Sequence, residues 1–498
     1  MISNLLQGII FNICTNQPIR PGGAHRIASI LRENQWDIEV CDYADDWPYE
    51  QLQEFCKSRI TSNTKFIGFS CFFDHWSEKI DDLVIWIREL YPNLLLIRGG
   101  QVPPKTLYPS YSIINYHVAG YGEKVIFELL KNTLGNGKFL PPLDLHFKLK
   151  GINLIDSNKF FPAWPMRKSS ILYEKRDYIE SWEWSTIEFS RGCKFQCPYC
   201  NFPVIGIKGD YTRDADDFEY QLRHGYDNWG ISNYYCADET FNDRTEKIIK
   251  FADITEKLNF IPYFSSFMRG DLVAARSQDW EHLVRLNMLG QFYGIESMNY
   301  ETTKLIGKGM QFEKLTEKLL EAKDYFLRNS GNRYRGTIAL IVGLPHETKQ
   351  TIEKTFSWIR KNWNDQCYMV WPLEISKDTA IDRQSKISLD YKSYGYLDQG
   401  TDVVYYENFV DNNSQHLNWK NEHFTFHDAS EIAYNFDREK FDQNSTYKLG
   451  GYELAQVSML GDIHDILSYK HNDVKILSEK LHIIKQRFLL RYIHKKLS

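Results

Sequence analysis

Three closely spaced cysteines are the residues of this sequence most able to do chemistry. Cys193, Cys197 and Cys200 stand in a CxxxCxxC spacing within the stretch Ser190 to Phe202. This spacing brings three thiolates onto one short loop, close enough to hold three corners of a cubane iron-sulfur cluster. Zinc sites and ordinary ferredoxins close their coordination with a fourth Cys or His, and none follows here. The pattern predicts a [4Fe-4S] cluster with one iron open to an exogenous ligand, and a zinc knuckle or an accidental triplet is the alternative.

The cysteine loop directly follows an expected strand, Trp184 to Phe189, that begins a series of alternating strands and helices. Six such units make a partial (β/α)6 barrel that is open on one side. Catalytic groups of βα barrels lie on the loops at the carboxyl ends of the strands, which is where the cysteines fall. The other expected strands are Ile231 to Cys236, Phe260 to Ser265, Gln291 to Ile295, Gly336 to Val342 and Cys367 to Trp371.

Residues 1–133 form a second alternating series, which predicts an α/β domain with a doubly wound, Rossmann-like parallel sheet. Residues 134–181 are rich in Gly and Pro and read as a connector. The barrel then spans 182–384, and a mixed, partly helical C-terminal region spans 385–498. Its last helix, expected at 473–497, would either pack on the barrel with a solvated basic face or dock a peptide substrate or another subunit.

The cysteine loop resembles that of the radical S-adenosylmethionine (radical SAM) superfamily, in which the open iron chelates the amine and carboxylate of SAM. Tyr199 matches the aromatic residue before the third cysteine, and the Gly-Leu-Pro-x-Glu-Thr string at 343–348 matches the loop beside the adenine. The N-terminal domain resembles the cobalamin-binding-type domain of many such enzymes, through Gly99-Gly100 and the Gly-Tyr-Gly-Glu string at 120–123. The loop with His25 lacks the Asp-x-His-x-x-Gly pattern, so a lower-axial histidine is unsupported, although cobalamin stays possible without it.

The same resemblance implies roles for side chains at the ends of the later strands. Asp238 and Glu239 would meet the SAM ammonium group. Arg269 would pair with the SAM carboxylate, as a bidentate guanidinium can. Glu296 and Ser297 lie in a Gly-Ile-Glu-Ser string that would face the ribose.

The remaining cysteines bear on the reaction. A barrel thiol, Cys236 or Cys367, could return a hydrogen atom to a carbon radical from the opposite face and so invert a stereocentre. Cys367 is the closer positional match to the donor of the proteusin-type radical SAM peptide epimerases, which the architecture resembles. Cys236 is its rival, because it ends its strand at the catalytic face whereas Cys367 begins one. No paired spacing for a second cluster occurs among the others, which are Cys14, Cys41, Cys56 and Cys71.

The resemblance therefore predicts an enzyme that cleaves SAM to a 5'-deoxyadenosyl radical and epimerises L to D residues of a ribosomally made precursor peptide. Its electron would come from an external donor of the flavodoxin or ferredoxin type. One alternative is a cobalamin-dependent radical SAM methyltransferase, which needs no donor cysteine. Another is a non-catalytic iron-sulfur protein, which would have no use for the ordered SAM-like loops.

Composition sets the remaining expectations. The 498 residues allow two or three domains, and the net charge of -5 gives no reason to expect nucleic acid as a partner. No run of 18 apolar residues occurs and the first residues lack a signal-peptide pattern, so we expect a cytoplasmic protein without a membrane partner. Nine cysteines, an odd number without a framework, favour reduced thiols.

Overall fold

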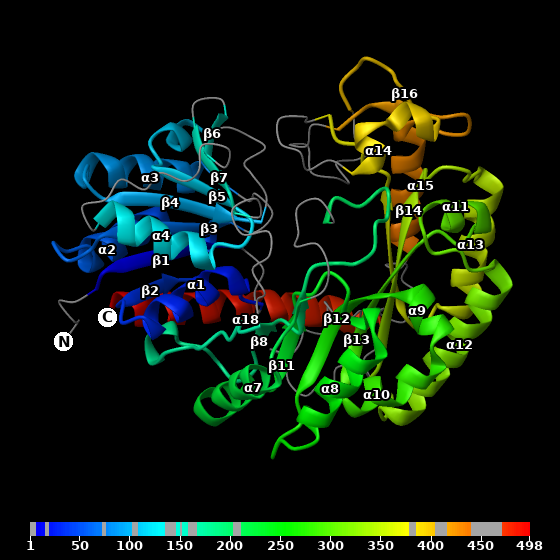
Figure 1. Cartoon of the computed structure of the whole chain (residues 1–498), viewed down its shortest axis with the longest axis horizontal. Coiled ribbons are helices and arrows are strands. Elements are labelled where there is room, and N and C mark those ends of the chain that lie inside the picture. The colour runs from blue at the N-terminus through cyan, green and yellow to red at the C-terminus, as the bar shows by residue number, and fades with distance from the viewer. Residues whose placement is uncertain are drawn as a thin grey trace.

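The protein has two parallel sheets, each covered by helices, that lie side by side (Figure 1). The computed structural model describes residues 6–14, 19–71, 76–101, 108–134, 146–149, 152–157, 167–202, 211–377, 385–403, 416–439 and 471–498. The first sheet belongs to the N-terminal domain and the second to the barrel, as the sequence predicts.

The N-terminal sheet has seven strands, of which all but the edge strand β6 (His146–Leu149) run parallel. The strand order reverses between β1 and β3, as in doubly wound folds. In spatial order the parallel strands are β2 (Ile38–Cys41), β1 (Gly8–Ile13), β3 (Phe66–Cys71), β4 (Leu95–Gly100), β5 (Tyr116–Ala119) and β7 (Ile152–Asp156).

Helices cover both faces of this sheet, so its strands are buried on both sides, as in β1, where every residue is buried. One face packs against α1 (Gly22–Glu33) and α4 (Glu123–Leu134). The other packs against α2 (Tyr49–Arg59) and α3 (Glu78–Leu90), and α3 begins where the Ser77 side chain accepts from the Ile80 amide.

The hairpin of β6 and β7 corrects the expected domain boundary. The sequence places residues 134–181 in a connector, yet β7 pairs with β5 and so extends the N-terminal sheet to residue 156. Strands of four and five residues separated by two residues are too short to show a period among the surrounding Gly and Pro. The connector proper begins after this hairpin.

The second sheet has six parallel strands in chain order, which confirms the predicted partial (β/α)6 barrel (Figure 1). Its strands are β8 (Trp184–Ile187), β11 (Asn233–Cys236), β12 (Tyr263–Arg269), β13 (Met288–Glu296), β14 (Arg335–Val342) and β15 (Cys367–Pro372). In β12, Phe264 and Met268 point outward and pack in one apolar core with the helices. Side chains alternate along a strand, so Ser265, Phe267 and Arg269 face the inside of the barrel.

The helices outside the barrel follow the strands in order, and α13 starts in a capping box formed by Thr348 and Thr351. They are α7 (Ala215–Trp229), α8 (Thr245–Thr255), α9 (Gly270–Ala275), α10 (Trp280–Arg285), α11 (Tyr300–Leu305), α12 (Phe312–Asn329), α13 (Lys349–Asn362) and α15 (Phe426–Arg438). The shorter elements are η1 (Ala44–Asp46), η2 (Pro109–Ser112), η3 (Lys175–Asp177), β9 (Ser190–Arg191), β10 (Tyr211–Thr212), η4 (Phe241–Asp243), η5 (Ser277–Asp279), α14 (Lys386–Leu389), η6 (Tyr391–Tyr394), β16 (Leu397–Asp398) and β17 (Trp419–Lys420).

The last helix, α18 (His471–Leu497), packs its C-terminal end against the N-terminal domain. Phe488, Tyr492 and Ile493 are buried in the core beside α2 and α3. In Figure 1 this red helix extends from below the barrel strands β12 and β13 to below the N-terminal sheet, where the chain ends. The sequence shows that the helix has an apolar stripe, but it carries no information on which domain the stripe covers.

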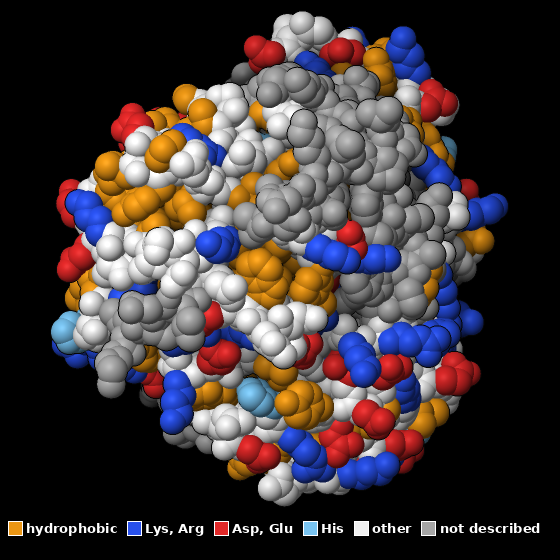
Figure 2. Space-filling view, turned by 60° about the vertical axis from the view of Figure 1, so that its left-hand side comes forward, with side chains coloured by type: hydrophobic (Ala, Val, Ile, Leu, Met, Phe, Trp, Pro, Cys, Tyr) orange, Lys and Arg blue, Asp and Glu red, His pale blue; other side chains and the backbone are white. Residues whose placement is uncertain are grey.

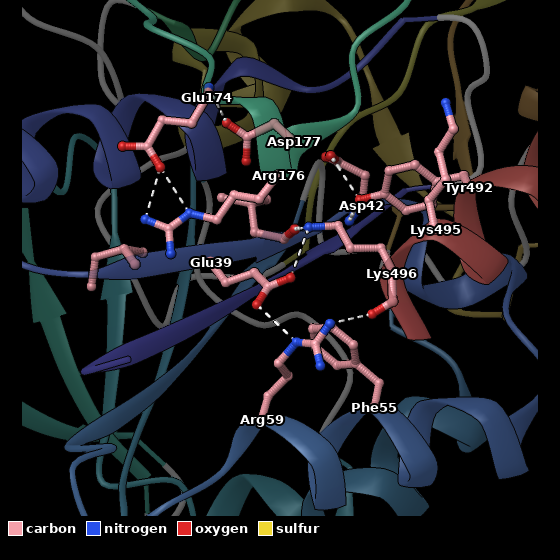
Figure 3. A network of polar contacts seen from close by, with 12 residues as sticks. Glu39, Asp42, Phe55, Arg59, Glu174, Arg176, Asp177, Tyr492, Lys495 and Lys496 are labelled. Atoms are coloured by element: carbon pink, nitrogen blue, oxygen red, sulfur yellow. Dashed lines mark hydrogen bonds and ion pairs between the residues drawn. The ribbon is translucent and has the colours of Figure 1, made fainter. Parts of the chain in front are cut away.

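A buried polar network fastens this end of the chain, as Figure 3 shows. The Lys496 ammonium group is fully buried, lies 3.1 Å from a Glu39 carboxylate oxygen and donates to the Val40 carbonyl at 2.7 Å. Arg59 bonds both Glu39 and the Lys496 carbonyl. The network therefore pairs charges that would otherwise be costly to bury.

A second buried network joins the N-terminal domain to the barrel. The Arg20 guanidinium lies 2.6 Å from Glu183, just before β8, and 2.7 Å from Asp42. Gly22 approaches β8 so closely that a Cβ there would meet the Thr186 side chain at 2.7 Å. These contacts fix the two sheets relative to each other.

The surface in Figure 2 mixes acidic and basic side chains over its lower part, and hydrophobic side chains gather near its centre. No helix in the described part of the chain is long and apolar enough to cross a membrane.

Candidate active site

The three cysteines lie on one loop at the carboxyl edge of the barrel sheet. The loop leaves β9, turns at Gly192, whose φ of +88° favours glycine, and reaches Cys193 directly. Cys193, Cys197 and Cys200 are all half-buried, and the Cys200 amide donates to the Cys197 carbonyl at 3.1 Å. The thiols are therefore held by a compact loop and stay partly exposed.

The donor set of this loop fits a cubane cluster. The Cys193 sulfur lies 3.5 Å from the Thr240 hydroxyl and the Cys197 sulfur lies 3.7 Å from an Arg269 nitrogen, so neighbouring strands bring side chains to the thiols. Within the described ranges, no three His, Cys, Asp or Glu side chains converge as ligands of a single metal ion would. Three thiols on one loop match a [4Fe-4S] cluster with one open iron better than a structural zinc site, which is closed by four protein ligands.

Asp238 is placed at the predicted edge but serves the cluster loop. Its two carboxylate oxygens accept from the Phe189 amide and the Ser190 hydroxyl, each at 2.7 Å. Burial raises the pKa of this carboxyl to about 7. Both oxygens thus bond residues that lie three and four positions before Cys193. The structure therefore favours a role in holding the cysteine loop over contact with the SAM ammonium.

Glu239 lies between the cluster loop and the N-terminal domain. One carboxylate oxygen accepts from the Gly192 amide at 3.0 Å, and the other accepts from the Tyr121 hydroxyl at 3.0 Å. Burial raises the pKa of Tyr121, so its hydroxyl stays protonated and can donate. Glu239 is half-buried, which leaves the predicted contact with a SAM ammonium open to it.

Arg191 completes the contact between the two domains. Its guanidinium lies over the Tyr121 ring at 4.1 Å from the ring centroid. The same group lies 2.7 Å from Glu123, at the start of α4, and 2.8 Å from Glu188. The Gly-Tyr-Gly-Glu loop of the N-terminal sheet is thereby bonded to the residue next to the cysteine loop.

Arg269 ends β12 above the cluster loop. It pairs with Asp271 at 2.7 Å and donates to the Gly307 carbonyl at 2.8 Å. Its guanidinium also lies 4.0 Å from the centroid of the Phe195 ring. These contacts hold the cation at the edge where the Cys197 sulfur lies, and its role toward the SAM carboxylate stays a prediction.

Glu296 ends β13 in the left-handed region, with a φ of 64°, which turns its side chain toward the cysteine loop. Its carboxylate accepts from the Tyr199 hydroxyl at 2.8 Å and from the Lys308 ammonium at 2.9 Å. The structure thus brings together Tyr199 and Glu296, which the sequence predicts separately. Lys308 was not predicted as a site residue, although it belongs to the same Gly-Ile-Glu-Ser…Lys-Gly pattern.

Ser297 is buried, and its side chain points toward Glu347 and not into an open site. Its hydroxyl donates to a Glu347 oxygen at 2.8 Å, while the other oxygen accepts from the amides of Gly343 and Leu344. Burial raises the pKa of Glu347 to about 8. Ser297 therefore holds the loop at 343–348, and its predicted contact with a ribose is not tested.

The two candidate hydrogen donors face different ways. Cys236 ends β11 fully buried in the core between strands and helices, and burial raises the pKa of its thiol. Cys367 lies on the inner face of β15, because its neighbour Tyr368 stacks on Phe436 of α15 outside the barrel. Cys236 ends its strand at the catalytic edge, but its side chain points away from the barrel interior. Cys367 is therefore the thiol that faces the interior.

The carboxyl edge of the N-terminal sheet has the open backbone surface that a large flat cofactor needs. Gly99 and Gly100 end β4 half-exposed, and a Cβ on Gly99 would meet no atom within 4 Å. Gly120, with a φ of 97°, turns the chain after β5. The residues present therefore fit a corrinoid, although the loops at 15–18, 72–75 and 102–107 lie outside the described residues.

His25 takes no part in this edge. Its Nε2 lies 2.9 Å from Asp42, and its side chain is fully buried against Tyr173. A corrinoid at the edge would therefore receive no axial ligand from His25, in agreement with the missing sequence pattern.

Sequence reasoning missed Tyr121, Arg191 and Glu123 as parts of the site. The Gly-Tyr-Gly-Glu string was visible, but only the packing of two domains reveals that its Tyr and Glu reach the cysteine loop. An arginine directly before the Gly-Cys pair was the available signal.

Comparison with protein families identifies one part of the chain. Residues 187–359 match the family model of the radical SAM superfamily, so this part of the chain is a radical SAM domain. That family uses a [4Fe-4S] cluster and SAM, as the cysteine loop predicts.

The chain is also similar to a curated protein, the anaerobic magnesium-protoporphyrin IX monomethyl ester cyclase of Synechocystis sp. The two are 28% identical over 246 residues, which is 46% of this chain and 47% of the cyclase. The similarity thus spans about half the length of that relative.

Two solved structures share the whole architecture. TsrM from Kitasatospora setae, a radical SAM methyltransferase, superposes with a TM-score of 0.67 at 14% identity over 96% of this chain and 99% of its own. OxsB, a cobalamin-dependent SAM radical enzyme, superposes with a TM-score of 0.61 at 16% identity over 97% of this chain and 71% of its own. At these identities the likeness shows a common fold.

Proposed function

We propose that this chain is a cobalamin-dependent radical SAM methyltransferase. The observation that carries the proposal is the bonded contact between the carboxyl edges of its two sheets, where Tyr121 meets Glu239 and Glu123 meets Arg191. This contact would put a cofactor on the N-terminal sheet next to SAM on the barrel. TsrM and OxsB, which share the fold, have been solved with cobalamin bound.

The chain's own residues would bind and orient SAM. Glu239 offers an anion to the ammonium group, and Arg269 offers a cation to the carboxylate beside Cys197. Tyr199 and Lys308 hold Glu296 at the end of β13, where it can accept from a ribose hydroxyl.

The cofactors supply the difficult chemistry. When bound, the cluster provides the electron that cleaves SAM, and when bound, cobalamin provides a carrier for the methyl group. A precursor peptide and an external donor of the flavodoxin or ferredoxin type stay our predictions for the partners.

Peptide epimerisation is the second candidate, and one observation favours it. Cys367 lies on the inner face of β15, in register with Thr337 of β14, so a thiol is present on the lumen side of the barrel. An epimerase would need that thiol and no cobalamin, whereas a methyltransferase would need cobalamin and no thiol.

The products formed from SAM separate the two candidates without a known substrate. The full chain would be reconstituted anaerobically with iron and sulfide, then given SAM and reductant with and without hydroxocobalamin. We expect S-adenosylhomocysteine, measured by mass spectrometry, only when cobalamin is present. Formation of 5'-deoxyadenosine alone, unaffected by cobalamin and retained in Cys367→Ala, would support epimerisation instead, because the thiol acts only after SAM is cleaved.

Matched cysteine variants provide the control. Cys197→Ala should abolish both nucleoside products because the cluster loses a ligand. Cys236→Ala removes a core thiol outside the loop and should leave both products unchanged per folded protein.

A further inference from the structure

An apolar wall lines the inner face of the barrel beside the cysteine loop. We define it as five inward side chains on four neighbouring strands. Their neighbours in sequence, such as Met268, Tyr293 and Val370, point outward into the core shared with the helices. The wall consists of Phe267 of β12, Phe292 of β13, Ile341 of β14, and Met369 and Trp371 of β15.

Strand register places this wall next to the SAM-binding residues. Phe267 and Phe292 occupy one row of paired residues, and Arg269 and Met369 occupy the next row toward the carboxyl edge. Arg269 in turn lies beside the Cys197 sulfur. A group bound on the wall would therefore lie close to the atoms that react.

The wall is accessible, which is unusual for a barrel interior. Interiors of βα barrels are normally filled by packed layers of side chains. Here Phe267 is 38% exposed although it has paired strands on both sides, and Trp371 is 39% exposed. Two large rings are thus left uncovered on the inner face of the sheet.

The wall is also uncharged. In the rows from Phe267 to Trp371, the described inward side chains that carry charge are Arg269 and Glu296. Both are already engaged: Arg269 pairs with Asp271 and is assigned to the SAM carboxylate, and Glu296 pairs with Lys308 and is assigned to the ribose. A charged group on the wall would lose its hydration without gaining a partner, so the wall suits a neutral ligand.

The rings of the wall are arranged to accept another ring. Phe267 meets Phe292 edge to face, with centroids 4.8 Å apart and planes at 71°. It meets Tyr235 in the same way, with centroids 6.1 Å apart and planes at 88°. Edge-to-face clusters of this kind extend readily to a further aromatic ring, and the thioether of Met369 adds a favourable contact.

We propose that the apolar wall binds a neutral aromatic group of the substrate and holds it in front of the cysteine loop. The inference rests on the proposed function, because it names the class of substrate group that the same barrel binds. It holds whether the substrate is then methylated or epimerised.

Binding of small probes tests the proposal without turnover. The full chain, reconstituted with its cluster and supplied with SAM but no reductant, would be titrated with indole, and binding would be measured by saturation-transfer NMR. Indole-3-acetate and tryptamine provide an anion and a cation of similar shape. We expect indole to bind at least fivefold more tightly than either charged probe.

Variants assign the binding to the wall. Phe267→Ala and Trp371→Ala should each weaken indole binding at least fivefold, whereas Ile261→Ala, which removes a more exposed apolar side chain outside the lumen, should change it less than twofold. Phe267→Leu keeps the volume without the ring and serves if the alanine variant does not fold. No saturable indole binding, equal binding of the charged probes, or binding that survives both wall variants would overturn the proposal. SAM cleavage is measured separately, so failure here leaves the proposed function standing.

Discussion

The hydroxyl of Tyr121 lies 3.0 Å from a carboxylate oxygen of Glu239, which is 118 residues further along the chain. The other oxygen of Glu239 accepts from the Gly192 amide at 3.0 Å, directly before the first cluster cysteine. A single carboxylate therefore joins the ligand edge of the N-terminal sheet to the cysteine loop. We therefore expect that a substitution at the edge of the N-terminal sheet alters SAM binding at the cysteine loop.

Tyr121→Phe removes the hydrogen bond while it keeps the ring beneath Arg191. We expect a loss of about 1 kcal/mol in SAM binding, roughly fivefold in Kd, because Glu239 is no longer held toward the site. Isothermal titration of the anaerobic, reconstituted protein with SAM measures it. Tyr220→Phe, at an exposed position of α7, is the control. An unchanged Kd in Tyr121→Phe would mean that the bond has no part in positioning Glu239.

The adjacent acids should respond differently to amide substitution. Asp238→Asn leaves one oxygen for two donors, so we expect lower iron content after reconstitution, with the SAM affinity of the loaded fraction little changed. Glu239→Gln should retain iron and weaken SAM binding about tenfold, since it removes the charge that we propose faces the ammonium. Iron analysis and titration with SAM separate the two effects. The reverse pattern would restore Asp238 as the SAM contact.

Glu347 should make stability depend on pH. Burial raises its pKa from 4.5 to about 8, so between these values the folded protein holds a proton that the unfolded chain has released. Since the folded state then binds more protons, the free energy of unfolding falls as pH rises through this range.

Glu347→Gln removes this titration and should flatten the dependence. Thermal unfolding at several pH values between about 5 and 9 checks it. Equal slopes in the wild type and the variant would contradict a raised pKa for Glu347.

The buried end of α18 should be important for stability. Lys496→Met leaves Glu39 with one fewer partner in a fully buried network, so we expect a loss of about 3 kcal/mol in the free energy of unfolding. Lys495→Met, one residue away, breaks a pair with Glu180 in which both side chains are more than one third exposed, and should cost less than about 1 kcal/mol. Chemical denaturation of both variants provides the comparison, and equal losses would show that the burial of Lys496 is unimportant.

Elements defined by local pattern could be predicted from the sequence. The six barrel strands appear in chain order with the cysteine loop after β8, because each is a short apolar run bounded by turns. The loops that follow carry their polar residues at strand ends, so Arg269 and Glu296 could be assigned to one edge before any coordinates were known.

Features that depend on packing between distant segments could not be predicted from the sequence. The side on which α18 packs, the hairpin that extends the N-terminal sheet, and the reach of Tyr121 to Glu239 all depend on how two domains meet. The direction of a cysteine side chain could not be predicted either. Cys236 ends its strand at the catalytic edge, but it points into the core.

The reduced cluster gives the most direct test of the central claim that Cys193, Cys197 and Cys200 hold a [4Fe-4S] cluster whose open iron binds SAM. Electron paramagnetic resonance of the anaerobic, dithionite-reduced protein would be recorded before and after addition of SAM. We predict a cluster signal that shifts when SAM is added and that is lost in the triple Cys→Ala variant. A signal that SAM does not alter, or one that persists in the triple variant, would contradict the account.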